Sequence, residues 1–294
     1  MRIFITGASG GIGTAVVSEL IAAGHQALGL ARSEASAGLI RRLGAEAVSG
    51  DLADTDMLKR VADDADGVIH LAFSNDFTNL EAGIQAEARA IAAVGEVLVG
   101  TGKPLILAAG TPTVAGRPST EEDPPQTEGP VGGRGRTSQA VVKLAEHGVR
   151  SALVRLPRSV HEAGGRCGFA SMLIASARRT GVSGYVGDGG QRWPAVHRLD
   201  AARLFRIAVE EAPAGSILHA VADQGDPMRE IAEVIGSRLR LPVQPVAAES
   251  YGVLGAIFAV DQPSSSALTR KRFGWQPSHP SLLADLSAGG YPDL

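Results

Sequence analysis

The stretch that most constrains this chain is a glycine-rich turn close to its first residue. Gly7, Gly10 and Gly13 recur at intervals of three residues, directly after a short β-rich run at Arg2–Thr6. Ile12–Ala23 then has the apolar spacing of a helix. A strand that turns through glycines into a helix presents backbone N–H groups and the positive end of the helix dipole to a phosphate. The stretch predicts a nucleotide-binding turn, and the alternative is a glycine-rich turn with only a structural role.

Each glycine of the turn has an expected role. Gly7 lets the chain turn sharply off the strand, and Gly13 lets the helix lie close to the sheet. Between them, the backbone approaches a pyrophosphate without a Cβ in the way. The residues of this turn expected to take part in nucleotide binding are Gly7, Ser9, Gly10, Gly11, Ile12 and Gly13.

Short β-rich runs alternate with helical patterns through the first half of the chain. This alternation predicts an α/β protein with a doubly wound parallel sheet of the Rossmann type. The expected strands lie at 26–30, 46–49, 67–72, 104–109 and 150–156, and the expected helices at 33–43, 54–62, 78–100 and 137–147. Residues 110–136 are rich in glycine, proline and acidic residues, which predicts a loop or a lid.

After Pro157 the pattern is less regular. Helices are expected at 169–180, 200–211, 227–239, 248–258 and 265–273, and strands near 184–187, 216–221 and 243–246. We expect a dinucleotide-binding core over residues 1–160. Residues 161–294 would supply the remaining sheet strands and a small substrate-binding lobe, interleaved with the core.

Composition excludes several classes of protein. The formal net charge of −3 argues against a dedicated surface for nucleic acid or for an anionic membrane. No secretory signal and no 18-residue apolar span are present, so we expect a soluble chain. The single cysteine, Cys167, allows neither a disulfide framework nor a cysteine metal site. A lone thiol fits the reducing cytoplasm, which is the expected location, and no metal is expected.

Several motifs together resemble the short-chain dehydrogenase/reductase superfamily, and its extended branch of NAD-dependent epimerases and dehydratases most closely. Thr6–Gly13 fits the glycine motif of that superfamily. Val154–Pro157 is similar to its strand ending in Arg-Pro near the nicotinamide. Gly187–Gly189 and Val196–Asp200 resemble its Gly-Asp-Gly and His-Val-Asp-Asp stretches, and Phe273–Pro277 resembles its Leu-Gly-Trp-x-Pro signature. The resemblance covers nearly the whole chain and implies a nicotinamide cofactor, with a homodimer as a further expectation.

Charge at the end of the second strand predicts which cofactor is preferred. NAD-preferring sites place a carboxylate there to bond the ribose hydroxyls, whereas the 2′-phosphate of NADP pairs with Arg. This chain has Arg32 beside Ser33, and the nearest acid is Glu34. We therefore expect NADP, with NAD as the second choice; the alternative reading of Arg32 is a solvated surface residue. By resemblance, Asp51 and Leu52 would contact the adenine, Leu71, Ala72 and Phe73 would run along the middle of the cofactor, and Leu156 would lie near the nicotinamide.

The usual proton donor of that superfamily is absent. It is a Tyr four residues before a Lys, and the Lys lowers the pKa of the phenol so that it exchanges a proton near neutral pH. The first tyrosine of this chain is Tyr185. The expected helix contains Lys143, but Gln139 stands four residues before it, and glutamine has no titratable proton.

Three other side chains are candidates for catalysis. Thr111, counted back from Gly116, falls where the family has its Ser or Thr and would bond a substrate carbonyl; the alternative is a turn residue before Pro112. Histidine is the commonest general acid, so His161 is a candidate for that role; its alternative is a structural hydrogen bond. Tyr185 would face the substrate lobe, and its alternative is packing within that lobe.

These observations favour an NADP-dependent oxidoreductase that transfers hydride to or from a small carbonyl or alcohol substrate. Two alternatives stay open. One is a protein that binds NADP(H) as a sensor without turnover, which the missing Tyr supports. The other is an epimerase or dehydratase of the sugar-nucleotide type, which the missing Tyr weakens.

Overall fold

The computed structural model describes residues 1–74, 79–164 and 168–291, so Cys167 lies outside the described residues. By their contacts the residues group into two units. Unit 1 comprises Met1–Ala109, Pro124–Arg155 and Ala201–Leu218, and unit 2 comprises Gly110–Asp123, Leu156–Asp200 and His219–Leu294. The chain passes between the units several times. Contacts alone do not test which part folds by itself, so the predicted boundary at residue 160 stays a prediction.

Unit 1 is built around a seven-stranded, mostly parallel sheet with the order β10-β6-β5-β4-β1-β2-β3. The strands are β1 (Arg2–Thr6), β2 (Gln26–Ala31), β3 (Glu46–Ser49), β4 (Gly67–His70), β5 (Pro104–Gly110), β6 (Arg150–Leu156) and β10 (Ser216–His219). β1 pairs in parallel with both β2 and β4. The strand order therefore reverses between β1 and β4, and the crevice beyond their carboxyl ends is where such sheets bind ligands. The predicted Rossmann-type fold is confirmed.

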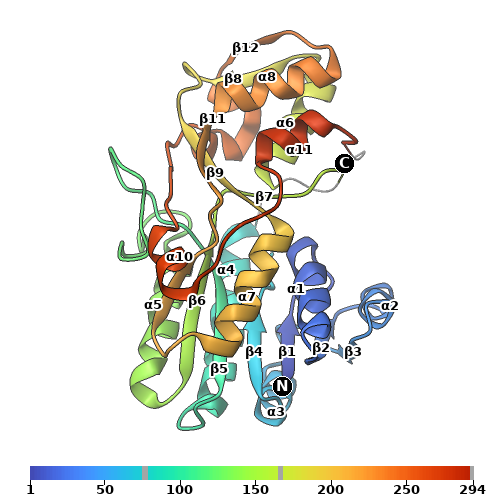
Figure 1. The fold of residues 1–294 in the computed structure, drawn as a ribbon, viewed down its shortest axis with the longest axis vertical. Helices are drawn as coiled ribbons and strands as arrows, with labels where there is room; N and C mark the ends of the chain where they lie inside the picture. Colours follow the sequence, from blue (N-terminus) through green and yellow to red (C-terminus); the bar gives the residue numbers. More distant parts are fainter. Residues whose placement is uncertain (75–78, 165–167, 292–294) are drawn as a thin grey trace. The chain divides into compact units, whose positions relative to one another are not determined.

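Helices cover the sheet of unit 1, as Figure 1 shows. They are α1 (Gly11–Ala22), α2 (Glu34–Arg42), α3 (Thr55–Asp64), α4 (Leu80–Leu98), α5 (Gly132–Lys143) with the 3₁₀ turn η2 (Leu144–His147), and α7 (Arg198–Glu211). Met57 and Leu58 of α3 and Val94 of α4 pack with Phe4 and Val68 of the sheet into one buried cluster. Burial of this apolar surface holds the helices against the strands.

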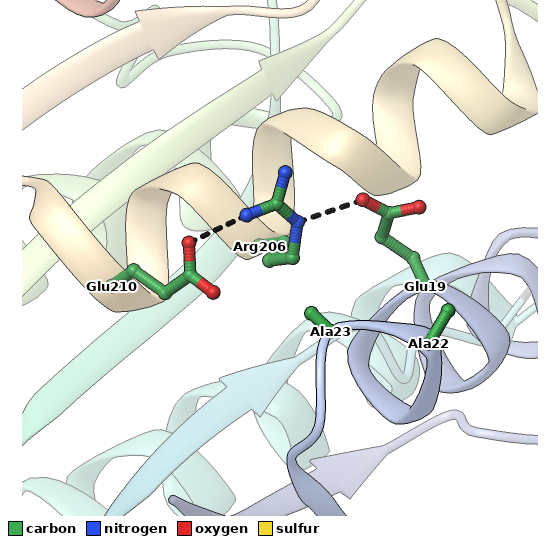
Figure 2. A pocket seen from close by; sticks show the side chains of 5 residues that line it. All are labelled: Glu19, Ala22, Ala23, Arg206 and Glu210. Atoms are coloured by element: carbon green, nitrogen blue, oxygen red, sulfur yellow. Dashed lines mark hydrogen bonds and ion pairs between the residues drawn. The ribbon is translucent and has the colours of Figure 1, made fainter.

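α1 and α7 lie side by side in unit 1 and line a groove (Figure 2). Arg206 of α7 bonds Glu19 of α1 and Glu210 of its own helix, each at 2.7 Å. Ala22 and Ala23, at the end of α1, also line the groove and add no polar side chain. Every charged side chain lining the groove therefore has an ion-pair partner within it.

Local sequence explains where the helices begin. Ser33 and Asp54 are N-caps, as predicted, and each side chain accepts a backbone N–H at the start of its helix. α5 begins at Gly132, five residues before the expected Thr137. The start of this helix was missed because it is rich in glycine. These glycines are needed for packing, since a Cβ at Gly132 or Gly135 would overlap the backbone of the preceding loop. The predicted loop over 110–136 therefore ends at Val131 instead.

Unit 2 contains two small sheets and several helices around one apolar core. The sheets are β11-β9-β7 and β12-β8. The elements are β7 (Ser159–His161), β8 (Ser183–Val186), β9 (Arg192–His197), β11 (Asp223–Pro227), β12 (Val243–Val246), α6 (Phe169–Thr180), α8 (Met228–Leu239), η3 (Ala248–Leu254), α9 (Gly255–Phe258), α10 (Ala267–Phe273) and α11 (Leu282–Ala288). Trp193, Phe258 and Leu282 are fully buried in the core. Of these elements β7, β9, β11 and α11 were not predicted. In the described residues, no helix is long and apolar enough to cross a membrane.

Candidate functional site

The turn between β1 and α1 is tight and lined by glycines. Gly7 has a φ of +73°, and a Cβ there would lie 2.8 Å from the backbone nitrogen of Ala72. The predicted sharp turn at Gly7 is therefore present, and it also brings the end of β4 against the turn. A side chain at this position would be strained and would collide with that backbone.

Gly10 and Gly13 allow the turn to pack closely against the start of the helix. The N–H of Gly10 donates to the Gly7 carbonyl at 3.0 Å. A Cβ at Gly13 would overlap the same carbonyl oxygen, so this glycine lets the helix approach the turn rather than the sheet. Gly10 is the N-cap of α1 and no side chain caps the helix there. Gly10 and Gly11 are exposed, and the first turn of α1 contains no acidic residue, so the positive end of the helix dipole lies at this turn.

A buried hydrogen-bond network lies beneath this turn. The hydroxyl of Thr6 lies 3.0 Å from Nδ1 of His70 and accepts the N–H of Ala72 at 3.3 Å. Burial, with a smaller effect of the Arg134 charge, lowers the pKa of His70 to about 4. The imidazole is therefore neutral at pH 7. It ties the ends of β1 and β4 together next to the Gly7 turn.

The end of β2 carries the side chains of Arg32 and Ser33, and their role in cofactor binding stays a prediction. Arg32 and Ser33 are exposed, and the Ser33 hydroxyl is engaged as the N-cap of α2. The nearby Glu34 pairs with Arg41 along that helix at 2.6 Å. Within the described ranges, Arg32 makes no side-chain hydrogen bond or ion pair. The end of β2 therefore presents an unneutralised guanidinium to solvent.

Of the other predicted cofactor contacts, Asp51 and Leu52 follow β3. The Asp51 carboxylate accepts the N–H of Ala53 at 2.9 Å, and Leu52 packs against the core. Leu71 and Phe73 follow β4 and are half-buried. Their placement at strand ends agrees with the carboxyl edge where the sheet would hold a nucleotide.

Arg134 of α5 is a residue for which the sequence suggested no role. Its guanidinium lies 4.0 Å from the ring centre of Phe73 and forms two hydrogen bonds of 2.9 Å with the buried Glu87 of α4. It also donates to the Ala108 carbonyl. The signal was present: Ile84, Glu87 and Ile91 share one helix face, so a carboxylate interrupts an apolar stripe and requires a cation.

α5 contains no tyrosine, and its polar residues do not replace one. Gln139 and Lys143 are exposed, and Lys143 is the last residue of the helix. The Tyr–Lys pair typical of the superfamily is therefore missing from this helix and has no substitute at the same spacing.

Thr111, in unit 2, is held by its backbone and not by its side chain. Its N–H donates to the Leu156 carbonyl at 3.0 Å, which brings two predicted site residues together. Its own carbonyl accepts the side-chain N–H of Gln262 at 2.6 Å. The residue is 5 % exposed, and its hydroxyl has no hydrogen-bond partner among the described residues. A buried hydroxyl without a partner is a candidate ligand group.

His161 and Tyr185 are both buried within unit 2. His161 has no exposed surface, and its Nδ1 lies 2.7 Å from the carboxylate of Asp285, a partner that sequence reasoning missed. Tyr185 belongs to the apolar core and has the Arg229 guanidinium 4.9 Å from its ring centre. No hydrogen bond or ring contact joins Thr111, His161 and Tyr185 within the ranges that the structure describes. Their assignment as catalytic residues stays a prediction.

Comparisons with known proteins agree with this geometry. Residues 3–220 match the NAD dependent epimerase/dehydratase family. An uncharacterized protein of Schizosaccharomyces pombe is 45% identical over 298 residues, which cover 99% of this chain and 100% of that protein. The UDP-glucose 4-epimerase of Thermotoga maritima, solved with UDP-glucose, is similar in structure with a TM-score of 0.79 at 18% identity, covering 99% of this chain and 98% of that one.

A dTDP-glucose 4,6-dehydratase of Streptomyces venezuelae, solved with NAD bound, has a TM-score of 0.79 at 17% identity and covers 98% of this chain and 95% of that one. At such identities the two solved structures establish the fold only. The family model matches three quarters of the chain, and the glycine turn and the sheet order agree with it. The chain belongs to the NAD dependent epimerase/dehydratase family.

Proposed function

We propose that this protein is an NADP(H)-dependent oxidoreductase that acts on a small carbonyl or alcohol substrate. The observation that carries the proposal is the glycine-lined start of α1, where Gly10 offers no side-chain cap, together with the exposed Arg32 at the end of β2. The first feature suits a pyrophosphate and the second suits a 2′-phosphate. Solved relatives in fold hold NAD, and the preference for NADP is our inference from Arg32.

The turn fits a dinucleotide on steric grounds. A Cβ at Gly11 would meet nothing within 4 Å, so the space that the missing side chain leaves is open for a ligand. By contrast Gly7 and Gly13 are glycines because protein backbone occupies the space. The residues that would hold the cofactor are those of the turn Gly7–Gly13, Arg32 and Ser33, and the strand-end residues Asp51, Leu52, Leu71, Ala72, Phe73 and Leu156.

A bound nicotinamide would supply the hydride chemistry of this reaction, and the residues of the chain would bind the substrate oxygen and provide its proton. The Thr111 hydroxyl would donate a hydrogen bond to that oxygen and stabilise the negative charge that develops there. The proton would come from water or from His161, whose pairing with Asp285 holds one ring nitrogen and leaves Nε2 unbonded within the described residues. Tyr185 is the second candidate donor. We also propose that the protein is located in the cytoplasm and forms a homodimer.

The second candidate function is a sensor that binds NADP(H) without turnover. The observation that favours it is the lack of a proton donor on α5, whose Gln139 and Lys143 face solvent. Epimerase or dehydratase chemistry on a sugar nucleotide, as in the solved relatives, needs the same proton transfers and is weakened by the same gap. Turnover separates the oxidoreductase from the sensor.

The first prediction concerns Thr111. We expect Thr111→Ala to lower kcat about 100-fold, because one oxyanion donor is lost, while the Kd for NADPH is unchanged. Thr111→Ser keeps the hydroxyl and should retain most of the activity. The measurement is the loss of NADPH absorbance with a panel of small aldehydes, ketones and quinones. Equal turnover of the wild-type protein and Thr111→Ala would remove Thr111 from the mechanism, and no turnover of the wild-type protein on the panel would favour the sensor.

A further inference from the structure

The main chain at Thr111 is fixed from both sides within unit 2. The Leu156 carbonyl accepts its N–H at 3.0 Å, and the Gln262 amide donates to its carbonyl at 2.6 Å. The same segment is anchored again at Ser119, whose hydroxyl bonds that of Ser264 at 2.9 Å. A stretch that the sequence predicted as a loop or lid is thus irregular in conformation yet held in place.

Arg158 determines which way the Gln262 amide faces. The guanidinium donates to Oε1 of Gln262 at 2.9 Å, so the nitrogen of that amide is the end directed to the Thr111 carbonyl. Arg158 is itself fixed by a 2.7 Å bond to the Ile257 carbonyl and by the Trp193 ring, whose centre lies 5.0 Å away. Burial lowers the pKa of Arg158 to about 10, and the group remains charged at pH 7. Cation, amide and carbonyl form one polarised series of hydrogen bonds.

The one polar group of Thr111 that this series leaves unbonded is its hydroxyl. With the residue 5 % exposed, an unpartnered hydroxyl costs free energy that the fold tolerates. Functional groups are commonly held in this way, with their main chain fixed and the reacting atom left available.

We infer that Arg158 and Gln262 are positioning residues for Thr111: the guanidinium orients the amide, and the amide fixes the carbonyl of Thr111, which holds in place the backbone from which the hydroxyl projects. This inference rests on the proposed function, in which that hydroxyl bonds the substrate oxygen. Small misplacements of such a donor reduce turnover because the reacting geometry is exacting. Neither residue needs to touch the substrate.

The test uses Gln262→Glu, which has the same shape. The new carboxylate still accepts from Arg158 but has no N–H to give to the Thr111 carbonyl. We expect kcat to fall roughly 10- to 100-fold with KM and the NADPH Kd unchanged. We also expect faster hydrogen exchange of the Thr111 N–H, followed by NMR with ¹⁵N-threonine and assigned by the signal that Thr111→Ser removes. Ser119→Ala is the matched control, because it loosens the same segment elsewhere and should change neither kcat nor that exchange.

Two results would overturn the inference. One is Thr111 exchange in Gln262→Glu equal to that of the wild-type protein. The other is faster exchange of the Thr111 N–H in Gln262→Glu with an unchanged kcat, when Thr111→Ala has been found to lower kcat. A wild-type protein without turnover overturns the proposed function and the catalytic part of the inference, whereas the exchange rate still decides whether Gln262 holds Thr111. If Gln262→Glu does not fold, Gln262→Asn removes the same contact by shortening the side chain.

Discussion

At the scale of single residues, the glycines of the first turn differ in why they are glycine. Gly13 is required by the protein itself, since a Cβ there would overlap the Gly7 carbonyl oxygen. Gly11 faces open space, with nothing within 4 Å of a built Cβ. Substitution at Gly13 therefore tests the stability of the turn, and substitution at Gly11 tests whether the turn binds a ligand.

This difference gives a prediction. Gly13→Ala should lower the free energy of unfolding by about 1–3 kcal/mol, because the added methyl forces the helix and turn apart. Gly11→Ala should leave stability within about 0.5 kcal/mol of the wild-type value and weaken NADPH binding, because the methyl fills space that the pyrophosphate would use. Urea unfolding and an NADPH titration measure both. Equal stability of the two variants would contradict this account of the turn.

Residue-level predictions from the sequence were correct where the cause is local. The Ser33 and Asp54 caps and the turn at Gly7 depend on neighbours within a few residues. Gln262 and Asp285 were missed because their partners, Thr111 and His161, are more than a hundred residues away. A local pattern carries no information about such a contact.

At the scale of elements, α4 and α5 are joined by the ion pair between Glu87 and Arg134. The carboxylate is 2 % exposed, and burial raises its pKa even though the Arg134 charge opposes that change. When the pKa of a carboxyl is higher in the folded than in the unfolded protein, the folded state loses stability as pH rises through the folded-state pKa, because the ionised carboxylate is costly to bury. The stability of the fold therefore depends on the Arg134 guanidinium, which offsets the buried charge of Glu87.

Removal of that cation should be costly. Arg134→Met leaves Glu87 buried without its partner, and we expect a loss of about 3–5 kcal/mol at pH 7. The loss should be smaller at pH 5, where Glu87 can take up a proton, and smaller also in Glu87→Gln/Arg134→Met. Arg41→Ala, which breaks the exposed pair with Glu34, is the control and should cost at most about 1 kcal/mol. Thermal unfolding at both pH values measures these differences, and a pH-independent loss would count against the buried charge.

Element prediction succeeded in unit 1 and was weaker in unit 2 for a physical reason. The strands of a buried parallel sheet are mostly apolar runs, such as β5, and are visible in the sequence. β11 reads Asp-Gln-Gly-Asp-Pro and β9 contains a proline, so neither resembles a strand. These strands form by pairing with each other, in a small sheet that only the folded chain defines.

At the scale of the whole molecule, our proposal is that this chain binds NADP(H). The sheet order reverses beside β1, the uncapped α1 begins there, and Arg32 follows β2 in the same unit. The fold and family followed from the sequence because the glycine spacing, the alternation and the later motifs all agree. The choice between NADP and NAD rests on one charge and is open to direct measurement.

The most direct test is calorimetric titration of the wild-type protein and Arg32→Ala with NADPH and with NADH. We predict that the wild-type protein binds NADPH more tightly. Arg32→Ala should lose about 1.5–3 kcal/mol of NADPH binding, the usual value of a charged contact, with NADH affinity nearly unchanged. Equal weakening for both cofactors, or tighter binding of NADH by the wild-type protein, would contradict the account.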